Sequence, residues 1–126
     1  MIRQRLGKDL LFFDGGMGTL LQEKGLAPGE LPETWNLTHS EEIYKIHRQY
    51  IEAGSDIILT NTFGANALKF HDDSCSLEEI IKAAVSHVKK AEREALLQTG
   101  DERKIYTALD VGPTGKLLKP MGDLKF

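Results

Sequence analysis

The chain has 126 residues, the size of one domain or of part of a larger one, so we expect no second independent domain. With 40% hydrophobic and 28% charged residues, the composition is that of a globular protein and excludes disordered and collagen-like chains. Sixteen lysines and arginines against nineteen acidic residues give a net charge of −3, which argues against a nucleic-acid-binding surface.

The first predicted strand is the apolar run from Leu10 to Phe13, which ends at Asp14. Because this run is apolar on both faces, we expect a buried strand of a parallel sheet. Apolar residues at helical spacing then predict a short helix from Met17 to Gly25. The segment from Leu26 to Asn36 contains two prolines and predicts a loop.

The middle of the chain predicts a helix followed by a second strand. Thr38 and Glu41 have the spacing of a capping box, and the helix that they would open extends to Gly54. The run from Asp56 to Thr60 is short, apolar and rich in β-branched residues, which predicts another buried strand.

A second capping-box pattern, Ser76 with Glu79, predicts a long helix that ends at Gly100. The apolar run from Ile105 to Leu109 predicts a third strand. The resulting order is β-α-β-α-β, and strands separated by helices pair in parallel. The sequence therefore predicts the α/β fold class.

Polar residues follow each predicted strand, and ligands of parallel α/β sheets bind where strands end. Asp14, Gly15 and Gly16 follow the first strand. An aspartate there can hold a substrate ammonium, while glycines let backbone N–H groups approach a carboxylate, so the group would recognise an amino acid. The alternative is a tight turn in which Asp14 caps the next helix.

The second and third strands end in similar polar segments. Asn61, Thr62 and Phe63 follow the second strand, and Asp110 follows the third. Amides, hydroxyls and one aromatic ring suit a pocket with apolar walls and a few fixed polar contacts. The alternative is that these side chains satisfy backbone groups in ordinary turns.

The sequence gives little support for a nucleotide or metal site. The glycines after the first strand lack the spacing of a dinucleotide-binding loop, and no P-loop lysine follows. Cys75 is the single cysteine, and the four histidines are scattered. We therefore predict no metal ligand and no catalytic residue in this chain. We expect the histidines to be satisfied core or surface residues and Trp35 to serve packing.

Taken in order, these segments resemble the homocysteine S-methyltransferase family. The resemblance is carried by Phe13 to Thr19, Glu33 to Thr38 and Ala53 to Asn66. The segment from Asp110 to Gly115 resembles in particular the N-terminal homocysteine module of cobalamin-dependent methionine synthases. The resemblance extends from about Leu10 to Asp123, with four motifs in the right order at compatible spacings.

This resemblance implies a (β/α)8 barrel, of which the chain would supply the N-terminal part with about three βα units. It also implies an enzyme in which a zinc-bound homocysteine thiolate attacks a methyl group to give methionine. The methyl donor would be methylcobalamin, recharged from methyltetrahydrofolate by later modules. By the same resemblance, Asp14 and Gly15 hold the amino acid end of the substrate, and Thr62 and Phe63 line its pocket.

The chain departs from the family pattern at the metal. The family's three zinc cysteines follow later strands, and Cys75 matches none of them. A barrel typically needs ~250 residues, so we expect residues 1–126 to be a partial domain, truncated before the zinc ligands, that binds no cofactor alone. Zinc and cobalamin are implied for the parent enzyme. The expected partners are homocysteine, the rest of the barrel, and the folate and cobalamin modules.

Two alternative functions stay open at this point. One is a cobalamin-independent homocysteine methyltransferase that uses betaine or S-methylmethionine. The other is a small α/β protein that binds an amino acid or a partner without catalysis.

The sequence also predicts a cytoplasmic location. No apolar run approaches the ~20 residues that span a bilayer, and the first residues lack the apolar stretch of a signal peptide. We therefore expect no membrane partner.

Overall fold

The computed structural model describes residues 1–72, 74–100 and 102–125, and Phe126, the last residue of the predicted partial domain, lies outside them. Within these residues, β1 (Ile57–Leu59) and β2 (Tyr106–Ala108) form a parallel sheet. Ile57 pairs with Tyr106 in the register of the two strands. Phe13 adds a single parallel bridge to Ile57 on the other edge of β1.

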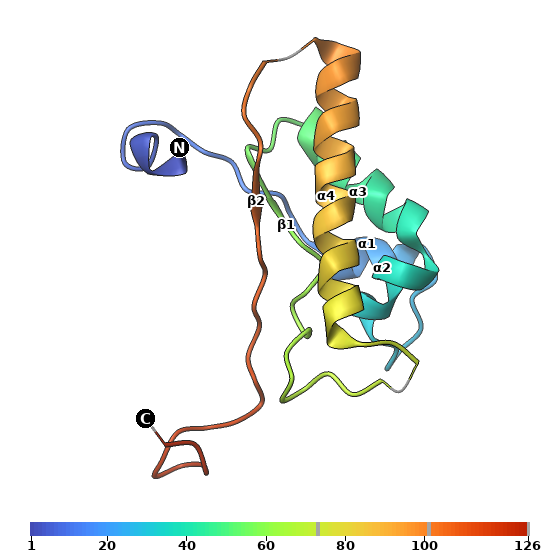
Figure 1. The fold of residues 1–126 in the computed structure, drawn as a ribbon, viewed down its shortest axis with the longest axis vertical. Coiled ribbons are helices and arrows are strands. Elements are labelled where there is room, and N and C mark those ends of the chain that lie inside the picture. The colour runs from blue at the N-terminus through green and yellow to red at the C-terminus, as the bar shows by residue number, and fades with distance from the viewer. Residues whose placement is uncertain (73, 101, 126) are drawn as a thin grey trace.

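Two helices alternate with these strands. Helix α3 (Ser40–Glu52) precedes β1, and α4 (Leu77–Thr99) connects β1 to β2. Figure 1 shows α3 and α4 side by side, with the two strands next to α4. The parallel pairing across a connecting helix is a βαβ unit, so the predicted α/β class is confirmed.

Helix α4 begins and ends where the sequence predicts. The Ser76 hydroxyl accepts a hydrogen bond from the Glu79 N–H, and the Glu79 carboxylate accepts one from the Ser76 N–H, which forms the capping box. Gly100 ends the helix with a φ of +65°, a left-handed conformation that glycine adopts without strain. The buried side of α4 carries residues at helical spacing, namely Ile80, Ala84, Val88, Ala91 and Ala95.

The predicted capping box of α3 is wrong. Helix α3 begins at Ser40, with His39 as its N-cap residue, while Thr38 is the last residue of another helix, α2 (Trp35–Thr38). The Thr38 hydroxyl donates to the Thr34 carbonyl at 3.2 Å. Because Thr38 is used inside α2, it does not cap the next helix.

The part of the chain before α3 is more ordered than predicted. A 3-10 turn, η1 (Ile2–Gln4), lies near the start of the chain, and α1 (Met17–Glu23) occupies most of the predicted first helix. The predicted loop from Leu26 to Asn36 contains a second 3-10 turn, η2 (Pro32–Thr34), and the first residues of α2. A single turn is too short to leave a periodic apolar pattern.

The core consists of two apolar clusters that meet at α3. One joins α3 and α4 to the sheet and contains Tyr44, Ile51, Ile58, Val88, Ala91, Ala95 and Ile105. The other packs the first part of the chain on α3 and contains Leu21, Leu26, Trp35, Ile43 and Ile46. Trp35 is 3% exposed and its indole N–H donates to Glu30, so its packing role is confirmed.

The predicted buried strand from Leu10 to Phe13 is wrong in extent and in burial. Phe13 contributes one bridge, and Leu10, Phe12 and Phe13 are each more than half exposed. The apolar pattern marks residues suited to burial, but burial requires a neighbour on each face. The described residues supply this segment with β1 on one edge and leave its outward side chains uncovered.

Among the described helices, none has the combination of length and apolar character that a membrane span requires.

Candidate functional site

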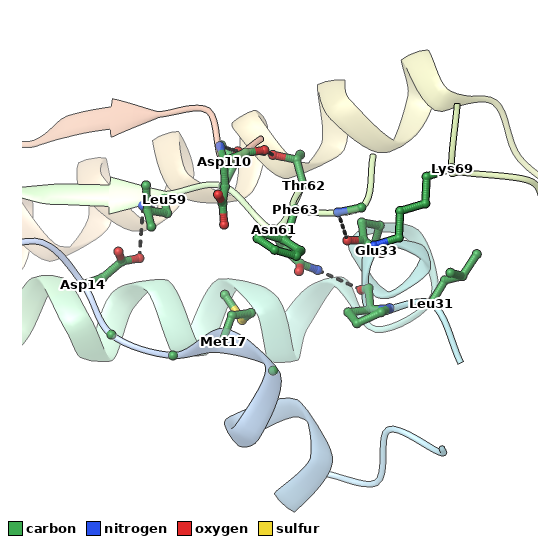
Figure 2. Close-up of a pocket in the computed structure, with 16 residues that line it drawn as sticks. Asp14, Met17, Leu31, Glu33, Leu59, Asn61, Thr62, Phe63, Lys69 and Asp110 are labelled. Carbon is green, nitrogen blue, oxygen red and sulfur yellow. Dashed lines mark hydrogen bonds between the residues drawn. The ribbon is translucent and has the colours of Figure 1, made fainter. Parts of the chain in front are cut away.

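The segments that follow the strands meet around one pocket of about 530 Å³. Figure 2 shows residues from all three segments around this pocket, together with residues of α1 and η2. The structure brings every predicted site residue to its lining, namely Asp14, Gly15, Gly16, Asn61, Thr62, Phe63 and Asp110. Parallel strands direct their carboxyl ends to the same edge, which explains why residues about 50 positions apart converge.

Asp14 is half-buried at the end of the first segment. Its Oδ2 accepts a hydrogen bond from the Leu59 N–H at 3.0 Å, and its own N–H donates to the Ile57 carbonyl at 3.0 Å. Its Oδ1 is buried and has no partner among the described residues. Burial raises the pKa of Asp14 to about 6, with a smaller contribution from Asp110 and an opposing one from the Leu59 hydrogen bond. Asp14 therefore lines the pocket with one carboxylate oxygen bonded to β1 and the other buried and unpaired among the described residues.

Gly15 and Gly16 lie beside Tyr50 of α3. The Tyr50 hydroxyl donates to the Gly16 carbonyl at 3.0 Å. A Cβ atom on Gly15 would lie 2.8 Å from that hydroxyl oxygen, so the close approach of α3 requires glycine there. Burial, with the nearby Asp14 carboxylate, raises the pKa of Tyr50. Tyr50 thus fixes the backbone of the glycine segment, which the sequence did not indicate.

The amide of Asn61 is used within the protein. Its Nδ2 donates to the Pro32 carbonyl at 2.8 Å and to Asn36 Oδ1 at 3.2 Å. Asn36 in turn donates to the Asn61 carbonyl at 2.8 Å, and both residues are buried. Asn61 therefore anchors the end of β1 to η2 and α2, and both of its amide hydrogens are committed.

The hydroxyls at the end of β1 join it to the end of β2. Thr62 Oγ1 donates to the Asp110 carbonyl at 2.8 Å, so in its 2.7 Å contact with Thr60 Oγ1 the Thr60 hydroxyl donates. The Asp110 N–H donates to Thr60 Oγ1 at 3.3 Å and completes the ring. These contacts hold the Asp110 backbone in place and use the Thr62 hydroxyl proton within the protein.

Phe63 forms one wall of the pocket and is 51% exposed. Its carbonyl accepts a hydrogen bond from the Gly112 N–H at 2.9 Å. Lys69 Nζ lies 5.7 Å from the centre of its ring and also lines the pocket.

The sequence pattern did not indicate Glu33 or Lys69 as pocket residues, nor Tyr50 as the residue that supports the glycine segment. Glu33 belongs to one of the family motifs, and its carboxyl is buried and lines the pocket. It follows Pro32 in a segment without periodicity, so nothing in the local pattern distinguishes it from an exposed loop residue.

The described residues contain no group of three or more His, Cys, Asp or Glu side chains that could hold a metal ion. Cys75 precedes α4 and does not line the pocket. The prediction of satisfied histidines is wrong for His47, which is fully buried with neither ring nitrogen bonded among the described residues. Burial, with the nearby His87, lowers the pKa of His47 to about 4.

Comparisons with solved structures find the same fold in a homocysteine methyltransferase. The chain is similar to the metallated and oxidized forms of MmuM from Escherichia coli, each with a TM-score of 0.76 at 24% sequence identity. The apo form of that protein gives a TM-score of 0.64 at 22% identity. The matches cover 90%, 90% and 82% of this chain, but 42%, 41% and 36% of the matched chains.

The sequence itself identifies the family. The family model described as homocysteine S-methyltransferase matches residues 11–125, which include every residue discussed above that lines the pocket. The resemblance to this family is thereby confirmed, and the chain belongs to the homocysteine S-methyltransferase family.

Proposed function

We propose that this chain forms the homocysteine-binding part of a methyltransferase that transfers a methyl group to the homocysteine thiolate to make methionine. Membership of the homocysteine S-methyltransferase family supports the reaction. The observation that carries the proposal is Asp14, which lines the pocket and whose Oδ1 is buried and unpaired among the described residues. A buried carboxylate oxygen without a donor is a strong site for a cationic ligand group.

The proposed fold of the parent enzyme is a (β/α)8 barrel, with residues 1–126 as its N-terminal part. The parallel pairing of β1 with β2 and the parallel bridge at Phe13 support this order of strands. A pocket at the carboxyl ends of the strands is where such barrels bind their substrates. The chain spans about two fifths of the methyltransferase to which it is similar.

In this proposal, the homocysteine ammonium binds Asp14 Oδ1, and Asp110 adds negative charge beside it. The N–H groups of Gly15 and Gly16, held by Tyr50, receive the substrate carboxylate. Phe63 covers the apolar stem of the substrate, and Asn61 and Thr62 act by fixing the pocket backbone. Three of the seven residues thus bind the charged groups of the substrate, Phe63 covers its stem, and Asn61 and Thr62 fix the ends of the strands. The Asp110 side chain contributes to the raised pKa of Asp14.

The described residues do not fit a zinc site, because they lack a cluster of ligands and because Cys75 lies away from the pocket. The proposal therefore assigns the zinc ligands and the catalytic residues to the parent enzyme outside residues 1–126. It likewise assigns cobalamin and folate to other modules. What this chain supplies is the orientation of homocysteine, since a fixed amino acid end places the thiol in one direction.

The experiment is a methyl-transfer assay of the complete protein encoded with this chain. Homocysteine is supplied with methylcobalamin, S-methylmethionine or betaine in separate reactions, and methionine is quantified. Methionine from methylcobalamin is the expected result. If methionine forms only from S-methylmethionine or betaine, that compound and not methylcobalamin is the methyl donor. A protein that binds homocysteine but forms methionine from none of the donors would support the binding-protein alternative.

A further inference from the structure

Glu33 has a buried carboxyl on the pocket wall, and the proposed function assigns it no role. It is 3% exposed, and its Oε1 accepts a hydrogen bond from the Gly64 N–H at 2.5 Å. Figure 2 shows Glu33 and Asp14 at opposite ends of the pocket, with Asn61 and Phe63 between them. Burying a carboxyl costs free energy unless it is bonded, so the hydrogen bond from Gly64 offsets part of the cost of burying Glu33.

The contact depends on a close approach of side chain and backbone. A Cβ atom on Gly64 would lie 2.9 Å from Glu33 Oε1, so a side chain there would force the Glu33 carboxyl to shift away from the Gly64 N–H. On the neighbouring residue, the Phe63 carbonyl accepts from Gly112, where a Cβ atom would lie 2.5 Å from that oxygen. The Phe63–Gly64 backbone is therefore held from two sides, by Glu33 of η2 and by Gly112 beyond β2.

We propose that Glu33 is a positioning residue for homocysteine, which acts by fixing the Phe63–Gly64 turn and with it the Phe63 wall of the pocket. This inference rests on the proposed function of the pocket. Its distance from Asp14 separates Glu33 from the group that holds the ammonium. The role requires a hydrogen-bond acceptor at Oε1 rather than a negative charge, because its partner is a neutral backbone N–H.

The requirement for an acceptor makes two substitutions informative. Glu33→Gln keeps an oxygen that can accept from Gly64, whereas Glu33→Ala removes it. Glu30 offers a matched control in the same segment, because its carboxylate also accepts a backbone N–H, that of Ala27 at 3.0 Å, and bonds Trp35, but it does not line the pocket. Glu30→Ala therefore perturbs the segment without touching the turn.

The experiment measures homocysteine affinity by calorimetry and the exchange rate of the Gly64 amide by NMR, in the complete protein. We expect Glu33→Ala to weaken homocysteine binding about tenfold and to accelerate Gly64 exchange at least about tenfold. Glu33→Gln and Glu30→Ala should stay within about threefold of the wild-type protein in both measurements. In the methyl-transfer assay, Glu33→Ala should raise KM and leave kcat within about twofold.

Three results would overturn the inference. Wild-type affinity in Glu33→Ala would show that the turn does not need Glu33. Equal weakening in Glu33→Gln with a protected Gly64 amide would show a direct charge contact with the ligand. Equal weakening in Glu30→Ala would show a general loss of segment stability. A wild-type protein that binds no homocysteine refutes the proposed function and this inference with it, while the Gly64 exchange rates separately show whether Glu33 holds the turn.

Discussion

Asp14 and Leu59 are joined by a hydrogen bond of 3.0 Å from the Leu59 backbone N–H to Asp14 Oδ2, across 45 residues of sequence. The bond orients the carboxylate so that Oδ2 is used by the end of β1 and Oδ1 remains without a partner among the described residues. The end of β1 thus fixes the orientation of the Asp14 carboxylate in the pocket wall. Homocysteine recognition in our proposal depends on this division of the two oxygens.

The pH dependence of binding follows from the pKa of Asp14, which burial raises to about 6. The ionised carboxylate binds the ammonium, so affinity should be constant above this pH and fall as pH decreases through it, approaching tenfold per pH unit. Homocysteine itself does not titrate between about pH 5 and 7. Calorimetry across this range measures the effect, and Asp14→Asn should make the fall in affinity with decreasing pH less steep, since only the part due to Asp14 is lost. An affinity that is equally high at about pH 5 would contradict the assigned role.

Burial of His47 should lower the stability of the protein, because the side chain lies fully buried on α3 with neither ring nitrogen bonded among the described residues. Replacing it with an apolar residue of similar size, His47→Leu, should raise the free energy of unfolding by about 1–3 kcal/mol at neutral pH. Urea denaturation measures the change. The exposed His71 supplies the control, since His71→Gln should leave stability within about 0.5 kcal/mol.

The same residue should make the fold sensitive to acid. The pKa of His47 in the folded protein, about 4, lies below its usual value of 6.5, so the unfolded chain binds the proton more readily. His47 therefore destabilises the fold progressively as pH falls from 6.5 toward 4. The raised pKa of Asp14 acts in the opposite direction over part of this range, but Asp14 is only half-buried and its effect is screened. His47→Leu should flatten the pH dependence of the unfolding midpoint, and an unchanged slope would contradict the assignment.

Gly15 and Gly18, which are three residues apart, should respond differently to substitution by alanine. Gly15→Ala places a Cβ atom 2.8 Å from the Tyr50 hydroxyl and should destabilise the protein by about 1–3 kcal/mol. Gly18, inside α1, has no atom within 4 Å of such a Cβ, so Gly18→Ala should stabilise the protein by about 0.5–1 kcal/mol. Thermal unfolding of both variants checks this. Tyr50→Phe combined with Gly15→Ala should recover part of the loss, and strictly additive effects would show that the two residues do not interact.

Local signals predicted the parts of the fold that local contacts determine. The capping box of α4 is a contact within three residues, and Gly100 adopts the left-handed conformation that its position requires. The convergence of Asp14, Asn61 and Asp110 was also predictable, because it follows from the direction of parallel strands. Asn61 nevertheless shows the limit of residue types, since its amide is used by Pro32 and Asn36, which lie in other segments.

Features that depend on distant partners could not be predicted. The burial of Glu33 arises from its bond to Gly64, 31 residues away, and no pattern around Glu33 announces it. Phe13 is exposed because no neighbouring element covers it among the described residues. Its apolar run indicates a preference for burial, but it does not show whether a covering neighbour is present. Thr38 has the correct spacing for a cap, yet α2 uses it first. In each case a tertiary contact decides between two locally reasonable structures.

The most direct test of the account is the homocysteine affinity of the complete protein with and without the Asp14 charge. Calorimetry at about pH 7.5, above the raised pKa of Asp14, compares the wild-type protein with Asp14→Asn and with Asp9→Asn, an exposed carboxylate outside the pocket. A charge-assisted hydrogen bond is worth about 1.5–3 kcal/mol, so Asp14→Asn should bind homocysteine roughly ten- to a hundredfold more weakly, while Asp9→Asn binds as the wild type does. Undiminished affinity in Asp14→Asn would contradict the account and leave Asp14 as a structural link to Leu59.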